Sequence, residues 1–160
     1  MNKLTLNNIL FSALFLFGIG NAMADDDYLK PFILASKGAG TVAEKTEQAK
    51  AALTAAGFTV VGNYSPYTDA SILVVTNDEL KKNAADSEHG GFGAIQRVSI
   101  TKIKDEVQVS YTNPVYMSHV YRMKSDLIGV VAGLANALGR VEEFGAKSMT
   151  AKQARNITIW

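Results

Sequence analysis

Residues 90–122 read GGFGAIQRVSITKIKDEVQVSYTNPVYMSHVYR, and this stretch decides the fold. In its first half, apolar side chains recur at every second position, as in Val98 and Ile100. A period of two places such side chains on one face of a β-strand. A short polar Lys-Asp-Glu segment, typical of a turn, separates this run from a second alternating run. The sequence therefore predicts an antiparallel hairpin of residues 94–103 and 107–112.

Both ends of this hairpin carry backbone signals. Pro114 ends the second strand, because proline has no N–H to donate to a neighbouring strand. The following residues, 115–122, are interpreted as another strand, with an irregular turn as the alternative. Before the hairpin, three glycines surround Phe92. They allow unusual backbone conformations and leave room for a close approach.

The first 24 residues have the pattern of a secretory signal peptide. Lys3 supplies a positive start, residues 9–20 are mostly apolar, and Ala22-Met23-Ala24 is a small-x-small cleavage site. The apolar run is shorter than the roughly 20 residues that span a bilayer, which disfavours a retained membrane anchor. We therefore predict an exported protein, periplasmic or secreted, with residues 25–160 as a single domain.

Charge and cysteine content exclude several classes of protein. The chain has 16 basic and 15 acidic side chains, and loss of Lys3 with the signal peptide makes the two numbers equal. A neutral surface offers no electrostatic attraction for nucleic acid or, after signal cleavage, for a membrane. The absence of cysteine excludes thiol chemistry, thiolate metal ligands and covalently attached haem.

Helices and strands outside the hairpin mix without regular alternation. Thr41 and Glu44 form a capping-box pattern at the start of a helix that Gly57 ends. Asn77 is expected to cap a short helix that lies loosely on the surface. Ser125 is expected to cap a longer one that ends at Gly139. Further strands are expected at residues 32–36, 58–64 and 72–75, the last of them central.

The long helix has an apolar stripe at helical spacing, formed by Leu127, Val130, Val131, Leu134 and Leu138. Gly129 and Gly133 are four residues apart, which allows this helix to approach the sheet closely. These elements predict an α+β fold, an antiparallel sheet with helices packed on one face in a β-α-β(4)-α-like order.

The runs GGFGAIQRVSITK and VQVSYTNPVYMSHVYR, together with Leu138-Gly139 and Phe144-Gly145, resemble the bacterial domain of unknown function 302. The resemblance covers most of residues 35–155. It implies a compact α+β unit with helices on one face of an antiparallel sheet, and it is consistent with export. No enzymatic activity is established for this family, so the resemblance adds almost nothing about chemistry.

The C-terminal residues depart from this resemblance. Thr150 opens another capping box, yet a helix of ordinary length has hardly begun when the sequence reaches Trp160. Exported relatives are expected to continue through a Tyr-His-Tyr-Met-like run at this point. One choice of codons for residues 156–160 reads Tyr-His-Tyr-Met in a shifted frame. We therefore expect a one-base slip that truncates a longer protein, which sequencing of the gene past its stop codon would test.

A candidate ligand-binding patch lies at the end of the hairpin stretch. Aromatic walls, an imidazole and a guanidinium suit a planar or anionic ligand, with the guanidinium as a fork for carboxylate or phosphate. The alternative is an amphipathic strand with its tyrosines in the core and Arg122 in solvent. The candidate residues are Tyr116, His119, Tyr121, Arg122, Gly91 and Phe92.

The remaining motifs identify no catalytic set, metal site or cofactor. His89 and His119 are 30 positions apart, and two histidines alone make a weak metal site. The glycines at 90–93 lack the lysine and the spacing of a phosphate-binding loop. Two hypotheses remain: a periplasmic module that binds a small molecule or a protein, and an enzyme or accessory redox subunit that uses the Tyr/His/Arg patch.

Overall fold

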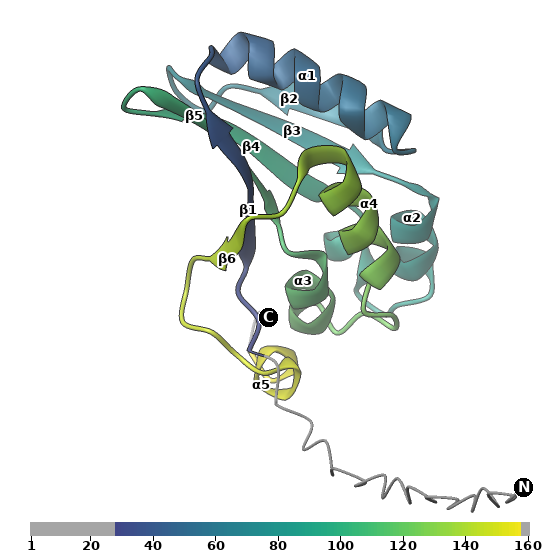
Figure 1. Ribbon diagram of the computed structural model, residues 1–160. Helices are drawn as coiled ribbons and strands as arrows, with labels where there is room; N and C mark the ends of the chain where they lie inside the picture. Colours follow the sequence, from purple (N-terminus) through teal and green to yellow (C-terminus); the bar gives the residue numbers. More distant parts are fainter. Residues whose placement is uncertain (1–27, 158–160) are drawn as a thin grey trace, which may run out of the picture.

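The computed structural model describes residues 28–157, which form a six-stranded antiparallel sheet with helices packed against it (Figure 1). The strand order across the sheet is β2-β3-β4-β5-β1-β6. The strands are β1 Phe32–Gly38, β2 Thr59–Tyr64, β3 Ala70–Thr76, β4 Gln96–Ile103, β5 Glu106–Thr112 and β6 Glu142–Phe144. The helices are α1 Val42–Ala55, α2 Asp78–Ala85, α3 Pro114–Val120, α4 Ile128–Leu138 and α5 Ala151–Arg155. The predicted α+β class is confirmed.

The predicted hairpin forms the middle of the sheet as β4 and β5. Val98 pairs with Tyr111 and Ile100 with Val109, in one continuous antiparallel register. The turn lies at Lys104, which adopts a positive φ of 56°. The first strand begins at Gln96, later than predicted, because the preceding residues form a short 3₁₀ turn at Gly90–Gly93. As predicted, β3 lies inside the sheet, between β2 and β4.

One hydrophobic core joins the sheet to both long helices. Leu53 of α1, Leu134 of α4 and Val98 of β4 are completely buried in the same cluster. Figure 1 shows α1 and α4 lying side by side over one face of the sheet. Burial of a side chain of this size stabilises a fold by about 1.5–3 kcal/mol relative to its exposure. The predicted apolar stripe of α4 therefore packs into the core, with Val130 and Leu134 at its centre.

The ends of α1 form as the sequence predicts. The Thr41 hydroxyl accepts a hydrogen bond from the backbone N–H of Glu44 at 3.2 Å, and the Glu44 carboxylate accepts one from the N–H of Thr41 at 3.0 Å. This capping box satisfies two of the N–H groups that have no partner within the helix. Gly57 adopts a φ of 84° just beyond the C-terminal end, where side chains are disfavoured.

Residues 115–122 are a correction to the sequence interpretation. The strand expected there is a helix, α3, that begins at Pro114. The Asn113 side chain accepts a hydrogen bond from the N–H of Val115 at 3.2 Å and so caps the helix. Proline is favourable at the first helical position, where its missing N–H would have no partner. The Asn-Pro pair that ends β5 therefore starts a helix.

Helix α2 is packed more firmly than expected. Asn77 caps it as predicted, through a 2.9 Å bond from the N–H of Leu80. However, Asn83 is also buried, and its amide makes two hydrogen bonds of 3.0 Å with the backbone of Ser125. The polar side chain of Asn83 thus ties α2 to the segment before α4. A sequence analysis that looks only for apolar anchors overlooks this contact.

The start of α4 differs from the expectation in detail. Ser125 lies before the helix, and the capping position is taken by Leu127 in a left-handed conformation with a φ of 61°. Gly133 approaches the aromatic ring of Phe58, which precedes β2, whereas Gly129 faces the carboxylate of Glu79 on α2. Gly133 therefore approaches a core side chain next to the sheet, Gly129 approaches α2, and the closest contacts of both glycines lie outside the strands. Gly139 ends the helix with a φ of 98°, as predicted.

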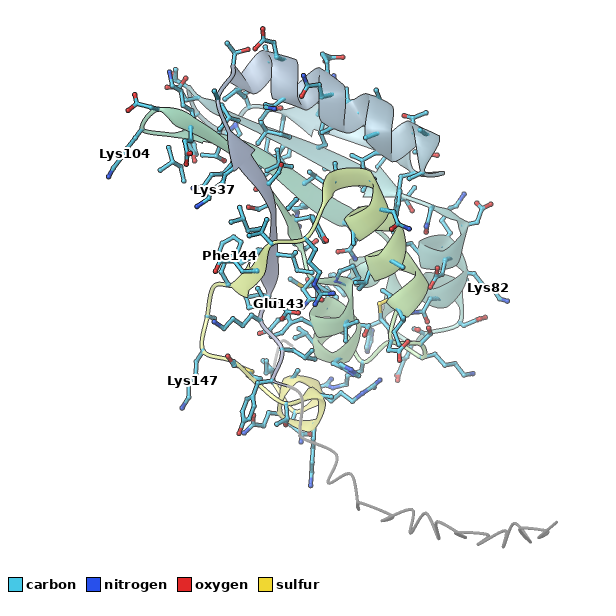
Figure 2. The ribbon with its side chains drawn as sticks, in the orientation of Figure 1. Lys37, Lys82, Lys104, Glu143, Phe144 and Lys147 are labelled. Atoms are coloured by element: carbon cyan, nitrogen blue, oxygen red, sulfur yellow. The ribbon has the colours of Figure 1, made fainter. Side chains whose placement is uncertain are left out.

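A short strand that the sequence did not indicate completes the sheet edge. Figure 2 shows Glu143 and Phe144 of β6 beside β1. The ring of Phe144 lies 5.7 Å from that of Phe32, and Glu143 accepts hydrogen bonds from Arg140 and from the N–H of Lys30. After this strand, α5 begins with the capping box predicted at Thr150.

Two sequence predictions lie outside the described residues. These are the signal peptide at residues 1–24 and the altered continuation at residues 158–160. Within residues 28–157, no helix is both long and apolar enough to cross a bilayer.

Candidate functional site

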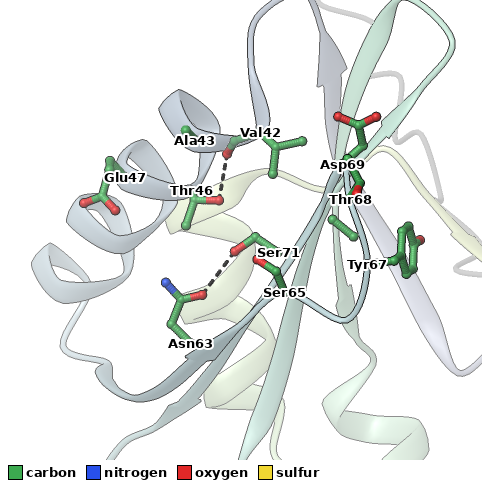
Figure 3. Close-up of a pocket in the computed structure, with 11 residues that line it drawn as sticks. Val42, Ala43, Thr46, Glu47, Asn63, Ser65, Tyr67, Thr68, Asp69 and Ser71 are labelled. Atoms are coloured by element: carbon green, nitrogen blue, oxygen red, sulfur yellow. Dashed lines mark hydrogen bonds between the residues drawn. The ribbon is translucent and has the colours of Figure 1, made fainter.

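A groove of about 750 Å³ opens between the N-terminal half of α1 and the β2–β3 hairpin, and we call it the α1–hairpin groove (Figure 3). Hollows elsewhere on the described surface include ones of about 260, 170 and 20 Å³. The volume of the groove is that of a small-molecule site. It is lined by Val42, Ala43, Thr46, Glu47, Asn63, Ser65, Tyr67, Thr68, Asp69, Ala70 and Ser71.

Two buried hydroxyl groups form part of the groove wall. Thr46 and Ser71 are only 5% and 6% exposed. The Thr46 hydroxyl donates to the carbonyl of Val42 at 2.7 Å, and the Ser71 hydroxyl donates to the side-chain oxygen of Asn63 at 3.1 Å. Figure 3 shows the first bond within α1 and the second within the β2–β3 hairpin. Each hydroxyl uses its hydrogen inside the protein, so what it offers a ligand is an acceptor lone pair.

The hairpin side of the groove is fixed by strand pairing. Tyr64 at the end of β2 pairs with Ile72 of β3, and residues 65–69 form the connecting loop between the two strands. The carbonyl of Asp69 accepts a hydrogen bond of 2.9 Å from the N–H of Lys102, which ties the loop to β4. Asp69 also adopts a positive φ of 66°, a conformation that aspartate and asparagine tolerate better than most residues. The strand pairing and the Asp69–Lys102 bond together hold the loop in place opposite α1.

The charges of the groove are all of one sign. Among its lining residues, Glu47 and Asp69 are acidic and none is basic. Glu47 forms an exposed ion pair with Lys50 at 2.7 Å, one turn further along α1. Figure 3 shows Glu47 and Asp69 on opposite sides of the groove, one on the helix and one on the loop.

The patch predicted from sequence lies elsewhere, around α3 and α5. The Nδ1 atom of His119 accepts a hydrogen bond from Nε of Arg155 at 3.1 Å. Arg122 donates to the carbonyls of Arg155 at 2.9 Å and Ile157 at 3.0 Å. Tyr116 is 8% exposed and packs with Val120 in a small apolar cluster. In the described chain, these groups hold the two helices together.

Two other predicted site residues, Phe92 and Tyr121, line a much smaller hollow. The rings of Phe92 and Tyr121 stack with their centroids 5.9 Å apart. With Arg97 and Thr112 among the other lining residues, they enclose about 20 Å³, which is the space of a single water molecule. Gly91 is exposed, and a Cβ atom built on it would meet nothing within 4 Å.

The room expected around the glycines is already filled by the protein itself. A Cβ atom on Gly90 would collide with the backbone of Ala84 in α2, and one on Gly93 would collide with the side chain of Met123. Gly90 and Gly93 therefore allow the chain to pack against its own helix and loop. This explains their presence without a bound ligand.

The chemistry of His119 follows from its surroundings. Burial lowers the pKa of the imidazole, and the positive charge of Arg155 lowers it further, while Asp126 acts in the opposite direction. His89 lies apart from this site and approaches Glu88 at 4.0 Å. Across residues 28–157, no three histidine or acidic side chains gather closely enough to hold a metal ion.

Sequence reasoning missed the groove because its residues come from two separate segments. One signal is visible in retrospect: residues 63–71 contain an unusual density of hydroxyl and amide side chains for a hairpin connection. The groove residues that come from α1 all lie within residues 42–47. In sequence they look like an ordinary solvated helix face. Bringing the two segments together requires the packing of α1 against β2 and β3.

Comparison with known proteins supports the fold of this chain and carries no information about its function. No model of a protein family matches the sequence, and no curated protein matches it. The structure is similar to the crystal structure of the uncharacterised conserved protein DUF302 from Bacillus stearothermophilus, with a TM-score of 0.56 and 15% sequence identity. The similarity covers 67% of this chain and 93% of the other. At this identity it shows a shared fold, of the kind that the sequence resemblance implied.

Proposed function

We propose that this chain is an exported module that binds a small polar molecule in the α1–hairpin groove. The observation that carries the proposal is the groove itself, about 750 Å³ in volume, with the buried hydroxyls of Thr46 and Ser71 in its wall. Sites for small ligands combine such a volume with a few convergent polar groups. Export rests on the signal-peptide pattern of residues 1–24.

Binding fits the groove better than catalysis does. A hydroxyl nucleophile needs a base that accepts its proton. Here the Ser71 hydroxyl donates to an amide oxygen and the Thr46 hydroxyl to a backbone carbonyl, and neither acceptor is a base. The lining residues include no histidine. The side chains of the groove can therefore hold and orient a ligand, but they form no activated nucleophile.

The enzyme or redox hypothesis required a shared pocket for the aromatic, imidazole and guanidinium groups. Tyr116 packs in an apolar cluster, whereas His119 and Arg122 make hydrogen bonds to α5 and the residues that follow it. Tyr121 lines the small hollow with Phe92. Because these groups point to different neighbours, no specific observation favours that hypothesis.

Native mass spectrometry of protein purified from the periplasm tests the proposal. We expect a small molecule to be retained by the wild-type chain and lost from Ala43→Trp, because Ala43 lines the groove and an indole there would fill it. Ala51→Trp places the same ring at an exposed position of α1 outside the groove and should retain the molecule. Equal retention by the two variants would contradict the assignment to the groove.

The same spectra test cleavage of the signal peptide. The proposal predicts a mature mass that begins at Asp25, after cleavage behind Ala24. A mass that includes Met1 would contradict this cleavage, and recovery of the chain only from the cytoplasm would contradict export; the groove assignment would stand on its own evidence.

A further inference from the structure

We infer that the α1–hairpin groove selects small organic cations that carry primary amines over anions of the same size. This inference rests on the ligand-binding function proposed above and adds the chemical class of the ligand. It is carried by the charges around the groove and by the direction of its internal hydrogen bonds.

The charge argument starts from the lining residues. They carry two carboxylates, Glu47 and Asp69, and no lysine, arginine or histidine. A cleft lined by one sign of charge concentrates ligands of the opposite sign. Glu47 is compensated in part by Lys50, but within residues 28–157 Asp69 makes no ion pair. The loop side of the groove therefore keeps an uncompensated negative charge.

The hydrogen bonds inside the groove also favour a cationic ligand. The hydroxyls of Thr46 and Ser71 donate to Val42 and Asn63 and so present acceptor lone pairs to a ligand. An ammonium group has three donors and no acceptor, and it is complementary to such a surface. A carboxylate or phosphate would need donors in their place, and would also face the two acidic side chains.

Two features of the site favour anions, namely the amide N–H groups of Asn63, whose oxygen already accepts from Ser71, and the positive end of the α1 dipole near Val42. Glu44, in the first turn of α1, offsets the helix dipole. Its carboxylate accepts hydrogen bonds from the backbone N–H and the hydroxyl of Thr41 at 3.0 and 2.9 Å. These bonds lower the pKa of Glu44, so the carboxylate is ionised at neutral pH. The positive end of the α1 dipole is thus already paired with the Glu44 carboxylate, and the net charge of the groove stays negative.

The test uses three probes with the same four-carbon chain: 1,4-diaminobutane, 1,4-butanediol and succinate. Each is titrated into the ¹⁵N-labelled mature protein, and amide shifts in residues 42–47 and 63–71 report binding in the groove. We expect the diamine to bind most tightly and succinate most weakly. The affinity for the diamine should fall with added salt, because screening weakens attraction between exposed charges.

Charge-removing variants complete the test. Glu47→Gln combined with Asp69→Asn should weaken diamine binding about fivefold, because each exposed charge contributes about 0.5 kcal/mol. Asparagine also tolerates the positive φ of residue 69, so the loop should keep its shape. Glu88→Gln removes one carboxylate outside the groove and should leave the affinity unchanged.

The outcomes separate the ligand class from the proposed function. Equal or tighter binding of the diol or succinate in the groove would overturn the preference for amines and leave the groove as a binding site. Diamine binding that the double variant leaves unchanged would overturn it as well. If none of the probes shifts the groove amides, the amine class is wrong, and the retained molecule in wild-type and Ala43→Trp protein decides whether the groove binds another class.

Discussion

The imidazole Nδ1 of His119 on α3 accepts a hydrogen bond of 3.1 Å from the guanidinium Nε of Arg155 on α5. Arg155 also donates to the carbonyl of Met123 at 3.1 Å. In return, Arg122 at the end of α3 donates to the carbonyls of Arg155 and Ile157. Arg155 of α5 thus binds to α3 and the loop after it, and Arg122, which follows α3, binds back to the end of α5. We call this set of bonds the α3–α5 contact.

Loss of Arg155 should loosen α5. The side chain makes two of the four hydrogen bonds in the α3–α5 contact and is partly exposed. We expect Arg155→Ala to destabilise the docked state of α5 by about 1 kcal/mol, which corresponds to roughly fivefold faster amide exchange in residues 150–157. Lys152→Ala, at an exposed position of the same short helix, is the control. Equal exchange in both variants would show that the apolar cluster alone holds α5.

His119 should make stability depend on pH. Burial and the neighbouring Arg155 lower the pKa of the folded-state imidazole, whereas the unfolded value is near 6.5. Below that value the unfolded chain binds the proton more readily than the folded chain does. The stability contributed by neutral His119 is therefore complete above about pH 6.5 and is lost as the pH falls toward the folded-state pKa.

Urea denaturation between pH 7.5 and pH 5 measures this effect. The wild type should lose more stability over this range than His119→Asn, whose amide oxygen can still accept from Arg155 but does not titrate. His89→Asn removes the other histidine of the chain, on a loop away from α5, and should keep the wild-type pH dependence. Identical pH slopes for His119→Asn and the wild type would sink this prediction.

The fold was predictable where local sequence and tertiary structure agree. The alternation in β4 and β5, the capping boxes at Thr41 and Thr150 and the stripe of α4 each rest on residues close in sequence. Prediction failed at α3, where apolar and aromatic residues suggested a strand. The capping by Asn113 and the favourable first-turn proline outweigh that propensity, because they fix the helix start directly.

The glycines before β4 offer a matched pair for mutagenesis. A Cβ atom on Gly90 would collide with the backbone of Ala84, which cannot move aside as a flexible side chain can. We therefore expect Gly90→Ala to cost about 1–3 kcal/mol in the free energy of unfolding. Gly91→Ala, with open space around its Cβ position, should change it by no more than about 0.5 kcal/mol. Similar costs for both variants would mean that α2 does not pack against this turn.

The packing of α4 gives a second matched pair. Leu134 is completely buried against the sheet, so Leu134→Ala should cost about 2–5 kcal/mol through lost burial and the cavity left behind. Ile128 on the same helix is 63% exposed, and Ile128→Ala should be close to neutral. Chemical denaturation of the two variants checks this. A neutral Leu134→Ala would show that α4 faces away from the core.

The candidate site was harder to predict than the fold because its groups are brought together by tertiary structure. Tyr116, His119 and Arg122 attracted attention through their chemistry, yet in the structure they pack and hydrogen-bond at the α3–α5 contact. Conversely, Thr46 and Ser71 look ordinary in sequence. They face one groove because β2 pairs with β3 and α1 lies above them, and that pairing is not encoded locally.

The central claim, that the α1–hairpin groove is the binding site of this protein, is tested most directly by a crystallographic fragment screen of residues 25–160. The account predicts that polar fragments gather between α1 and the hairpin, within hydrogen-bond reach of Thr46 and Ser71, and that amine-bearing fragments dominate there. A groove without fragments, with ligands gathered instead beside His119 and Tyr121, would contradict the account.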